Sequence, residues 1–266
     1  MSETAQALPM PAFLRSRAIR PLLITVLVIY FIFSMISLAP AKIAGWAINA
    51  SMPNVWLTSV RGTLWNGVAG GAQFQIGEQS IALGSVRWTL NPMTLLTLQP
   101  CISFEVDSGG QPMSGLVCQS PFGITRLKDL NMDLPLSVLE SVLPVRATGD
   151  LSIQIIEASI TGQRVDELDA RVTWQNASVF NGESWWSLGT FGGQAKHNNE
   201  GGIAVRIFDV SGPVGVDVNA AFALGSELFT LSGNITPRSE APEQMKQGLQ
   251  MIGEEVEPGT YKVSWP

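Results

Sequence analysis

The chain has 266 residues, of which 45% are apolar and only 14% are charged, well below the ~25% that is usual for soluble proteins. Its 26 glycines and 16 prolines suit one large or two small turn-rich domains. The formal net charge is −6, and three arginines and one glutamate give residues 1–20 a charge of +2, which leaves −8 for the remainder. An acidic, sparsely charged body does not suit nucleic acid or anionic lipid surfaces, so no nucleic-acid partner is expected.

The first predicted element is a transmembrane helix at residues 21–41. No charge lies between Arg20 and Lys42, and a helix of this length, rising ~1.5 Å per residue, crosses a hydrocarbon core of ~30 Å. The preceding arginines predict a cytoplasmic tail at 1–20 and place the rest of the chain outside the cytoplasm. A cleaved signal peptide is the alternative, because residues 39–41 (Ala-Pro-Ala) have the small residues of a cleavage site. The apolar stretch, however, exceeds the usual signal length.

After a juxtamembrane segment at 42–58, residues 59–266 form a β-rich domain. Apolar and polar residues alternate repeatedly there, for example over 214–220 and 260–265, which is typical of half-buried strands. The fold class is therefore mainly β, with a curved antiparallel sheet that is either an open groove or sandwich-like. The apolar parity flips at residues 155 and 156, as an inserted bulge residue would cause.

Two short helices are expected beside the sheet. One covers 134–143, bounded by Pro135 and Pro144. The other covers 240–252, with Ser239 as its N-cap and apolar residues at helical spacing. Both are expected to cap an end or edge of the sheet.

The two cysteines, Cys101 and Cys118, are placed to face each other across a hairpin. If Gly109 and Gly110 form its two-residue turn, paired residue numbers sum to 219, as 101 and 118 do. The pair then occupies a position without ladder hydrogen bonds, where the Cα atoms lie ~4.5 Å apart, within reach of a disulfide. Two reduced, buried thiols are the alternative. Without a C-x-x-C motif the pair is structural in both cases.

Residues 61–67 (RGTLWNG) lead into a glycine-rich stretch that raises the question of a ligand loop. A phosphate-cradling loop would place these glycines at a strand-to-helix turn, and no helical pattern follows. Parity puts Leu64, Val68 and Ala72 on one side of a strand and Trp65, Gly67 and Ala69 on the other. The stretch is therefore interpreted as a curved strand in which small residues make room for the Trp65 indole or for another segment.

A weak internal echo suggests two β-units, 59–143 and 144–266. Arg61 precedes Trp88 by 27 residues, and Arg146 precedes Trp174 by 28, with similar neighbours at both places. Duplication of a unit of about 85 residues would explain the echo, and chance is the alternative.

Residues that could carry catalysis are sparse, so the chain is predicted not to be an enzyme. His197 is the only histidine and lies in a polar stretch, and no nucleotide-binding, hydrolase or metalloprotease motif is present. The acidic runs at 166–169 and 254–255 are expected to be solvated turns. No catalytic, cofactor-binding or metal-binding residue is therefore assigned. Trp185 and Trp186, which follow an Asn-Gly turn, are the candidate contact patch.

The ordered set of motifs resembles the type II secretion system protein N family of Gram-negative bacteria. The set spans nearly the whole chain and also includes the stretches 209–213 and 233–238. Its principal residues are Arg61, Gly62, Thr63, Leu64, Trp65, Gly67, Trp88, Pro92, Gly212, Pro213, Gly259 and Tyr261. The resemblance implies a single-pass protein of the cell inner membrane with a periplasmic domain, an accessory part of the machine that exports folded proteins across the outer membrane. Its partners would be other type II secretion components and, through the anchor, the lipid bilayer. It implies no catalytic residues.

The strands are also similar to the AsmA-like group, in which curved sheets form a groove associated with lipid handling. That similarity supports an alternative, a periplasmic carrier or sensor that holds a lipid or another hydrophobic ligand on the sheet. A continuous apolar lining of one sheet face would favour the groove, and a filled core would favour a scaffold.

Overall fold

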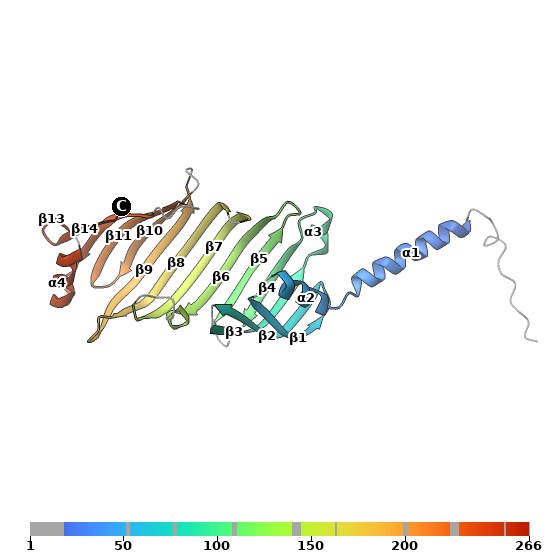
Figure 1. The fold of residues 1–266 in the computed structure, drawn as a ribbon, viewed down its shortest axis with the longest axis horizontal. Coiled ribbons are helices and arrows are strands. Elements are labelled where there is room, and N and C mark those ends of the chain that lie inside the picture. The colour runs from blue at the N-terminus through green and yellow to red at the C-terminus, as the bar shows by residue number, and fades with distance from the viewer. Residues whose placement is uncertain are drawn as a thin grey trace, which may run out of the picture.

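The computed structural model describes residues 19–51, 54–76, 79–107, 111–139, 145–162, 164–198, 202–223, 229–252 and 254–265. Within them, 14 strands form one sheet in chain order, except that β14 lies between β12 and β13. Figure 1 shows a long band of strands with α1 at one end and α4 at the other. The strands are β1 (Val55–Gly62), β2 (Asn66–Ile76), β3 (Gln79–Leu90), β4 (Cys101–Asp107), β5 (Pro112–Gln119), β6 (Ile124–Pro135), β7 (Ala147–Thr161), β8 (Arg164–Phe180), β9 (Trp185–His197), β10 (Gly202–Ser211), β11 (Val214–Ala223), β12 (Phe229–Pro237), β13 (Glu254–Glu257) and β14 (Thr260–Trp265). The helical elements are α1 (Ile19–Ser37), α2 (Lys42–Ser51), α3 (Pro92–Leu96), the 3-10 turn η2 (Leu136–Leu139) and α4 (Glu243–Ile252).

One face of the sheet carries an unbroken apolar row from β1 to β14. Residues directly opposite each other on neighbouring strands lie on the same face, and the register links Val60 to Val263 through a series of such pairs. The apolar row is Val60, Ala69, Val86, Val106, Met113, Met132, Ile153, Val172, Gly193, Ile207, Val218, Gly233 and Val263.

The neighbouring row, displaced by one residue along every strand, lies on the other face and is polar apart from Val68. It consists of Arg61, Val68, Arg87, Glu105, Ser114, Asn131, Gln154, Arg171, Gln194, Arg206, Asn219, Ser232 and Ser264. Along this pair of rows the sheet is therefore two-sided from β1 to β14.

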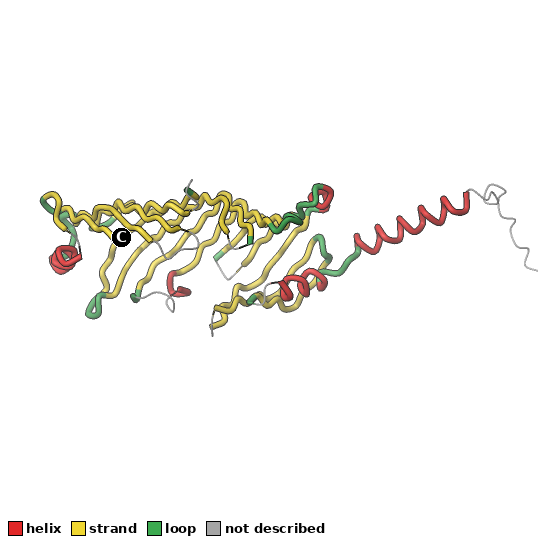
Figure 2. Tube along the Cα trace, turned by 45° about the horizontal axis from the view of Figure 1, so that its top comes forward, coloured by secondary structure: helices red, strands yellow, loops and turns green. Residues whose placement is uncertain are grey.

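Bulges bend the strands, so the sheet is curved. The register shifts within several strand pairs, among them β2–β3, β5–β6, β7–β8 and β8–β9, and a bulge increases local bend and twist. The shift between Ile155 and Glu157 confirms the bulge predicted from the parity flip. Figure 2 shows the resulting curvature. The sandwich-like alternative is wrong for the described residues, because every strand named above belongs to the one sheet.

Helix α1 projects from the sheet with its apolar side chains exposed (Figure 1). It ends at Ser37, before the predicted boundary at residue 41, because the chain there pairs with the sheet through a bridge between Pro40 and Thr63. Among the described residues, no helix is both long enough and apolar enough to cross a bilayer. A span at 21–41 therefore stays a prediction, as does the tail at 1–20, most of which lies outside the described residues.

The juxtamembrane segment expected at 42–58 folds onto the sheet. It forms α2 and the start of β1, which begins at Val55 and not at residue 59. Ala41, Ala69 and Trp88 make a small buried cluster at this end of the sheet. Apolar burial thus draws α2 onto the face of β1.

The two predicted helices differ from the structure in type or extent. In place of a helix over 134–143, β6 continues to Pro135, since Leu134 pairs with Leu151 in the sheet, and only η2 follows. Residues 140–144 lie outside the described residues. The second helix, α4, begins at Glu243 and not at 240, so Ser239 is not its N-cap. Proline at 242 has no N–H to lose at a helix start.

The predicted boundary between two β-units, at 143 and 144, falls between β6 and β7. These strands pair from Ile124 opposite Thr161 to Pro135 opposite Asp150. The sheet is thus continuous across this point, and a division into two units stays a prediction.

Candidate functional site

The turn between β1 and β2 fastens the N-terminal helical segment to the sheet. Three hydrogen bonds join residues 62–65 to residues 36–41, with donor–acceptor distances between 2.7 and 3.1 Å. The donors and acceptors are Leu64 N to Ala39 O, Trp65 Nε1 to Ile36 O, and Ala41 N to Gly62 O. Most of the RGTLWNG motif therefore acts as an attachment point for the chain that precedes it.

Two residues give this turn its shape. Gly62 has φ +96°, and a Cβ there would lie 2.4 Å from the carbonyl oxygen of Asn66, so only glycine fits. Thr63 closes the turn, since its N donates to Asn66 O at 2.9 Å and its Oγ1 accepts from Asn66 N at 3.1 Å. Arg61, the first motif residue, is exposed on β1.

The indole that lies over the glycines of β2 belongs to Trp88. Trp88 is 5% exposed and donates from Nε1 to Leu64 O at 3.3 Å. A Cβ added to Gly67 would lie 2.1 Å from Cζ2 of Trp88. The small residues of β2 therefore make room for another segment, β3, and not for the Trp65 indole. Trp65 is only partly buried.

The parity expected for β2 is wrong after residue 69. Ala69 and Ala72 are both buried, at 0% and 2% exposed, because the register shifts between them. Val68, expected on the same side as Ala72, is 40% exposed. A bulge among the glycines changes which residues face the core.

The second half of the sheet contains a counterpart of the Trp88 contact. Trp174 Nε1 donates to Thr148 O at 3.2 Å, and a Cβ added to Gly149 would lie 2.6 Å from that indole nitrogen. These residues belong to the internal echo found in the sequence. Both sites share an indole-to-carbonyl bond, although Gly149, unlike Gly67, has a positive φ of +129°, and the repeated unit stays a prediction.

The motif stretches 209–213 and 233–238 meet in an ion pair. Asp209 Oδ2 lies 2.5 Å from Arg238 Nη2, and Asp209 Oδ1 accepts from Val216 N at 2.8 Å. Arg238 also donates from Nη1 to Gly212 O at 2.6 Å and from its backbone N to Pro213 O at 2.7 Å. This arrangement ties the turn between β10 and β11 to the end of β12.

Burial works to raise the pKa of Asp209, but the hydrogen bonds from Val216 and Arg238 outweigh it and hold the pKa below its usual value. Gly212 beside it has φ +139°, and a Cβ there would lie 2.2 Å from Leu188 O. This motif glycine is therefore required by a close backbone approach.

The remaining motif residues also have structural positions. Asn91 Oδ1 accepts from Met93 N at 3.0 Å as the N-cap of α3, in which Pro92 is the first residue. Gly259 has φ +79° in the turn between β13 and β14. Tyr261 is 4% exposed and pairs with Ile235.

Cys101 and Cys118 are directly opposite on β4 and β5 and are joined by a disulfide, with Cα atoms 4.0 Å apart. The register agrees with the one expected, down to Asp107 opposite Pro112. The two glycines of the expected turn lie outside the described residues.

Trp185 and Trp186 have different environments. Trp185 is 51% exposed and contacts Phe180 in a tilted arrangement, with ring centroids 5.4 Å apart and ring planes inclined by 51°. Trp186 is partly buried against the cluster that holds α4 to the sheet, which includes Val214 and Met245. Of these two tryptophans, only Trp185 offers a large exposed surface.

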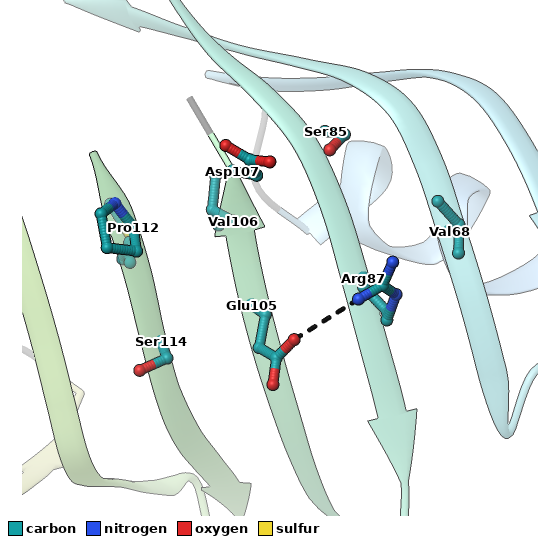
Figure 3. Close-up of a pocket in the computed structure, with 9 residues that line it drawn as sticks. Val68, Ser85, Arg87, Glu105, Val106, Asp107, Pro112 and Ser114 are labelled. Carbon is teal, nitrogen blue, oxygen red and sulfur yellow. Dashed lines mark ion pairs between the residues drawn. The ribbon is translucent and has the colours of Figure 1, made fainter. Parts of the chain in front are cut away.

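The hollows of the sheet are open and lined mainly by the polar face. One of about 450 Å³ contains the ion pair between Arg87 Nη1 and Glu105 Oε2, 3.6 Å apart (Figure 3). Another lies beside Asp166, Asp169 and His197. No group of three or more His, Cys, Asp or Glu side chains within the described residues could hold a metal ion.

The acidic runs are strands and not the solvated turns expected. Residues 166–169 lie within β8 and residues 254–255 within β13. Hydrogen bonds from Thr161, and then from Arg164, lower the pKa of Asp166. That carboxylate is therefore held ionised, which does not suit a general acid.

Taken together, these positions define a protein built on one long two-sided sheet, with a helical segment fastened to its first hairpin. The chain belongs to the type II secretion system protein N family, which matches residues 53–264 and thus nearly the entire sheet. It is similar to a protein of Aeromonas hydrophila named Type II secretion system protein N, with 26% identity over 228 residues that cover 80% of this chain and 84% of the relative. No solved structure is significantly similar.

The resemblance to this family is confirmed, and membership supports an accessory role in type II secretion. Neither match names the AsmA-like group, so that similarity stays a prediction.

Sequence reasoning gave no role to Asp209 and Arg238 and passed over the exposed residues of α3. The first pair is separated by 29 residues, too far for a local pattern. The α3 signal was present in the sequence as a leucine-rich, uncharged stretch after Pro92.

Proposed function

We propose that the chain is a non-enzymatic accessory component of the type II secretion system, attached to the inner membrane with its sheet in the periplasm. The observation that carries this proposal is the family match over residues 53–264, which spans β1 to β14 almost completely. The described residues of the site fasten turns and strands, and none of them forms a nucleophile–base pair.

Helix α1 supplies the membrane attachment in this proposal. Its side chains are exposed along its length, including Leu27 at 68%, Tyr30 at 71% and Phe33 at 67%. Such a surface is costly in water and favourable in lipid. Trp46 and Trp56, which are 73% and 56% exposed close by, suit the interfacial region in which tryptophan is enriched.

Other secretion components are the proposed partners, with Trp185 as a contact. An exposed tryptophan that packs against a second ring presents a rigid apolar surface of the kind that dominates protein interfaces. Trp186 does not share this role, because it supports α4.

Deletion of the gene in the bacterium that encodes the chain tests the secretion role. Secreted proteins should accumulate in the periplasm, and the wild-type gene should restore export. A Trp185→Ser gene should restore it only partly. A gene with serine in place of Trp265, which is 67% exposed on β14, should restore it fully if Trp185 is the contact. Unchanged export in the deletion strain would contradict the proposal.

A second candidate function, binding of a lipid or another hydrophobic ligand, is favoured by the apolar row that runs from Val60 to Val263. Helices α2 and α4 lie toward opposite ends of this sheet (Figure 1), and much of the row between them has no described helix over it. Photo-crosslinkers at Ile153 and at Gln154, its neighbour on the polar face, separate the two functions. Lipid adducts at Ile153 alone would support a ligand groove, and equal or absent adducts would contradict it.

A further inference from the structure

The α3 corner of the sheet exposes apolar side chains that no described element covers. Met93 is 69% exposed, Leu96 81% and Leu98 69%, and no residue of α3 is buried. Phe122, in the turn between β5 and β6, is 85% exposed. Exposing several large apolar residues together in water is unfavourable and marks an interaction surface.

This exposure is built into a fixed scaffold. Thr94 Oγ1 donates to Asn91 O at 2.6 Å and accepts from Cys101 N at 3.0 Å. The disulfide to Cys118 braces the strand that follows. The corner is thus held by hydrogen bonds and a covalent link, and its apolar side chains contribute little to holding it together.

The α3 corner and the attachment of α1 lie at the same tips of the strands, the end at which β1, β3 and β5 finish. Strands β1, β3 and β5 run in the same direction, since each strand is antiparallel to its neighbours. The turn at 62–65, the α3 connection and the turn at 120–123 therefore follow one another along one end, and the first of them binds residues 36–41. Figure 1 shows α3 at the end of the sheet nearest to α1.

Charge changes along this end with distance from α1. Residues 88–104 and 119–125 contain no charged side chain. Farther along the same end, the turn between β7 and β8 is flanked by Arg164 and Asp166, and the end of β9 carries Lys196. The α3 connection and the turn at 120–123 therefore lie in uncharged stretches, although Arg61 and Arg126 flank this end of the sheet.

We propose that Met93, Leu96, Leu98 and Phe122 form a bilayer-contacting edge, which dips into the headgroup boundary of the membrane that α1 enters. This inference rests on the proposed membrane attachment of α1. Uncharged apolar turns beside α1 suit the headgroup boundary, which buries apolar side chains without a complementary protein surface. The motif turn and this edge would together fix the orientation of the sheet on the membrane.

Fluorescence of the full chain in vesicles tests the edge. Single cysteines carrying an environment-sensitive dye are introduced by Leu96→Cys and Phe122→Cys, without reductant so that the native disulfide persists. Tyr30→Cys in α1 is the positive control, and Glu183→Cys, in the turn at the opposite end of the sheet, is the negative control. The vesicles contain phosphatidylethanolamine and phosphatidylglycerol, with or without brominated phosphatidylcholine as a quencher.

Blue-shifted emission at 96 and 122 that brominated lipid largely removes, with unchanged emission at 183, is the expected result. Quenching at 30 with none at 96 and 122 would overturn the edge and leave the attachment of α1 intact. Quenching at 96 and 122 but not at 30 would support the edge and overturn the attachment, and no quenching at any position would overturn both. A blue shift that grows with protein concentration and resists brominated lipid would indicate a second copy of the chain, and would also overturn the edge.

Discussion

Replacing Trp88 with alanine should destabilise the first part of the sheet more than any change in the RGTLWNG turn. The ring is 5% exposed and packs against Ala69, and its Nε1 donates to Leu64 O. Truncation of a buried tryptophan costs about 3–5 kcal/mol. Trp88→Phe retains most of the ring and should cost only about 1–2 kcal/mol, chiefly the lost hydrogen bond and the smaller ring.

A substitution at Gly67 tests the same contact with the Trp88 ring from the other strand. Its backbone does not require glycine, but a Cβ would lie 2.1 Å from Cζ2 of Trp88. Gly67→Ala should therefore cost about 1–3 kcal/mol through overpacking. In a Trp88→Ala background the ring is gone, and the same change should be nearly neutral. The coupling between the two positions should thus be close to the full cost of Gly67→Ala.

Thermal unfolding of the detergent-solubilised full chain measures these costs, and hydrogen exchange locates them in β1 to β4. Gly193→Ala is the matched control, because the nearest atom to its Cβ is 3.8 Å away, and it should change stability by less than about 1 kcal/mol. Equal costs of Gly67→Ala with and without the Trp88 ring would refute the assignment of this contact.

Three further predictions concern the other fastened residues. Asp209→Asn should cost about 1–3 kcal/mol at neutral pH by weakening the ion pair with Arg238. The folded pKa of Asp209 is lowered, so the carboxylate stabilises the fold above the unfolded pKa of about 4. This stabilisation is lost as the pH falls through the folded pKa. The two unfolding curves should therefore converge in acid, and a constant gap down to the lowest pH at which both fold would count against the pair. Trp65→Phe should cost only about 1 kcal/mol in thermal unfolding, yet increase hydrogen exchange in residues 36–41, which would stay protected if the indole bond did not hold them. Serine at both Cys101 and Cys118 should cost about 2–4 kcal/mol, and reductant should lower the melting temperature of the wild type but not of the double variant.

Local patterns were sufficient for several features of this fold. The number of residues between Cys101 and Cys118 fixed their pairing once the turn was placed, because strand registers are rigid. Parity within Leu151–Ile160 located a bulge for the same reason. The helix expected over 134–143 was wrong because Leu134 and Pro135 pair with β7 at the end of β6, and residues 136–139 form only a 3-10 turn.

The candidate site was harder to predict from the sequence than the fold. The motif residues were found, but their functions depend on contacts between distant segments, such as Trp88 over Gly67 and Asp209 beside Arg238. The sequence left two interpretations of the small residues open, the Trp65 indole or another segment, because only Trp65 is adjacent to the glycines in sequence. The indole that packs there comes from β3, which only the strand register brings alongside.

The sequence by itself determined the β class, the disulfide register, the absence of recognisable catalytic motifs and the family, because each depends on residue type and local spacing. Only the tertiary structure decided that all described strands form one open sheet, that apolar and polar rows cross it from β1 to β14, and that the RGTLWNG turn fastens the N-terminal helical segment. These features depend on registers that accumulate over many strand pairs, and one bulge reverses the face of every residue after it.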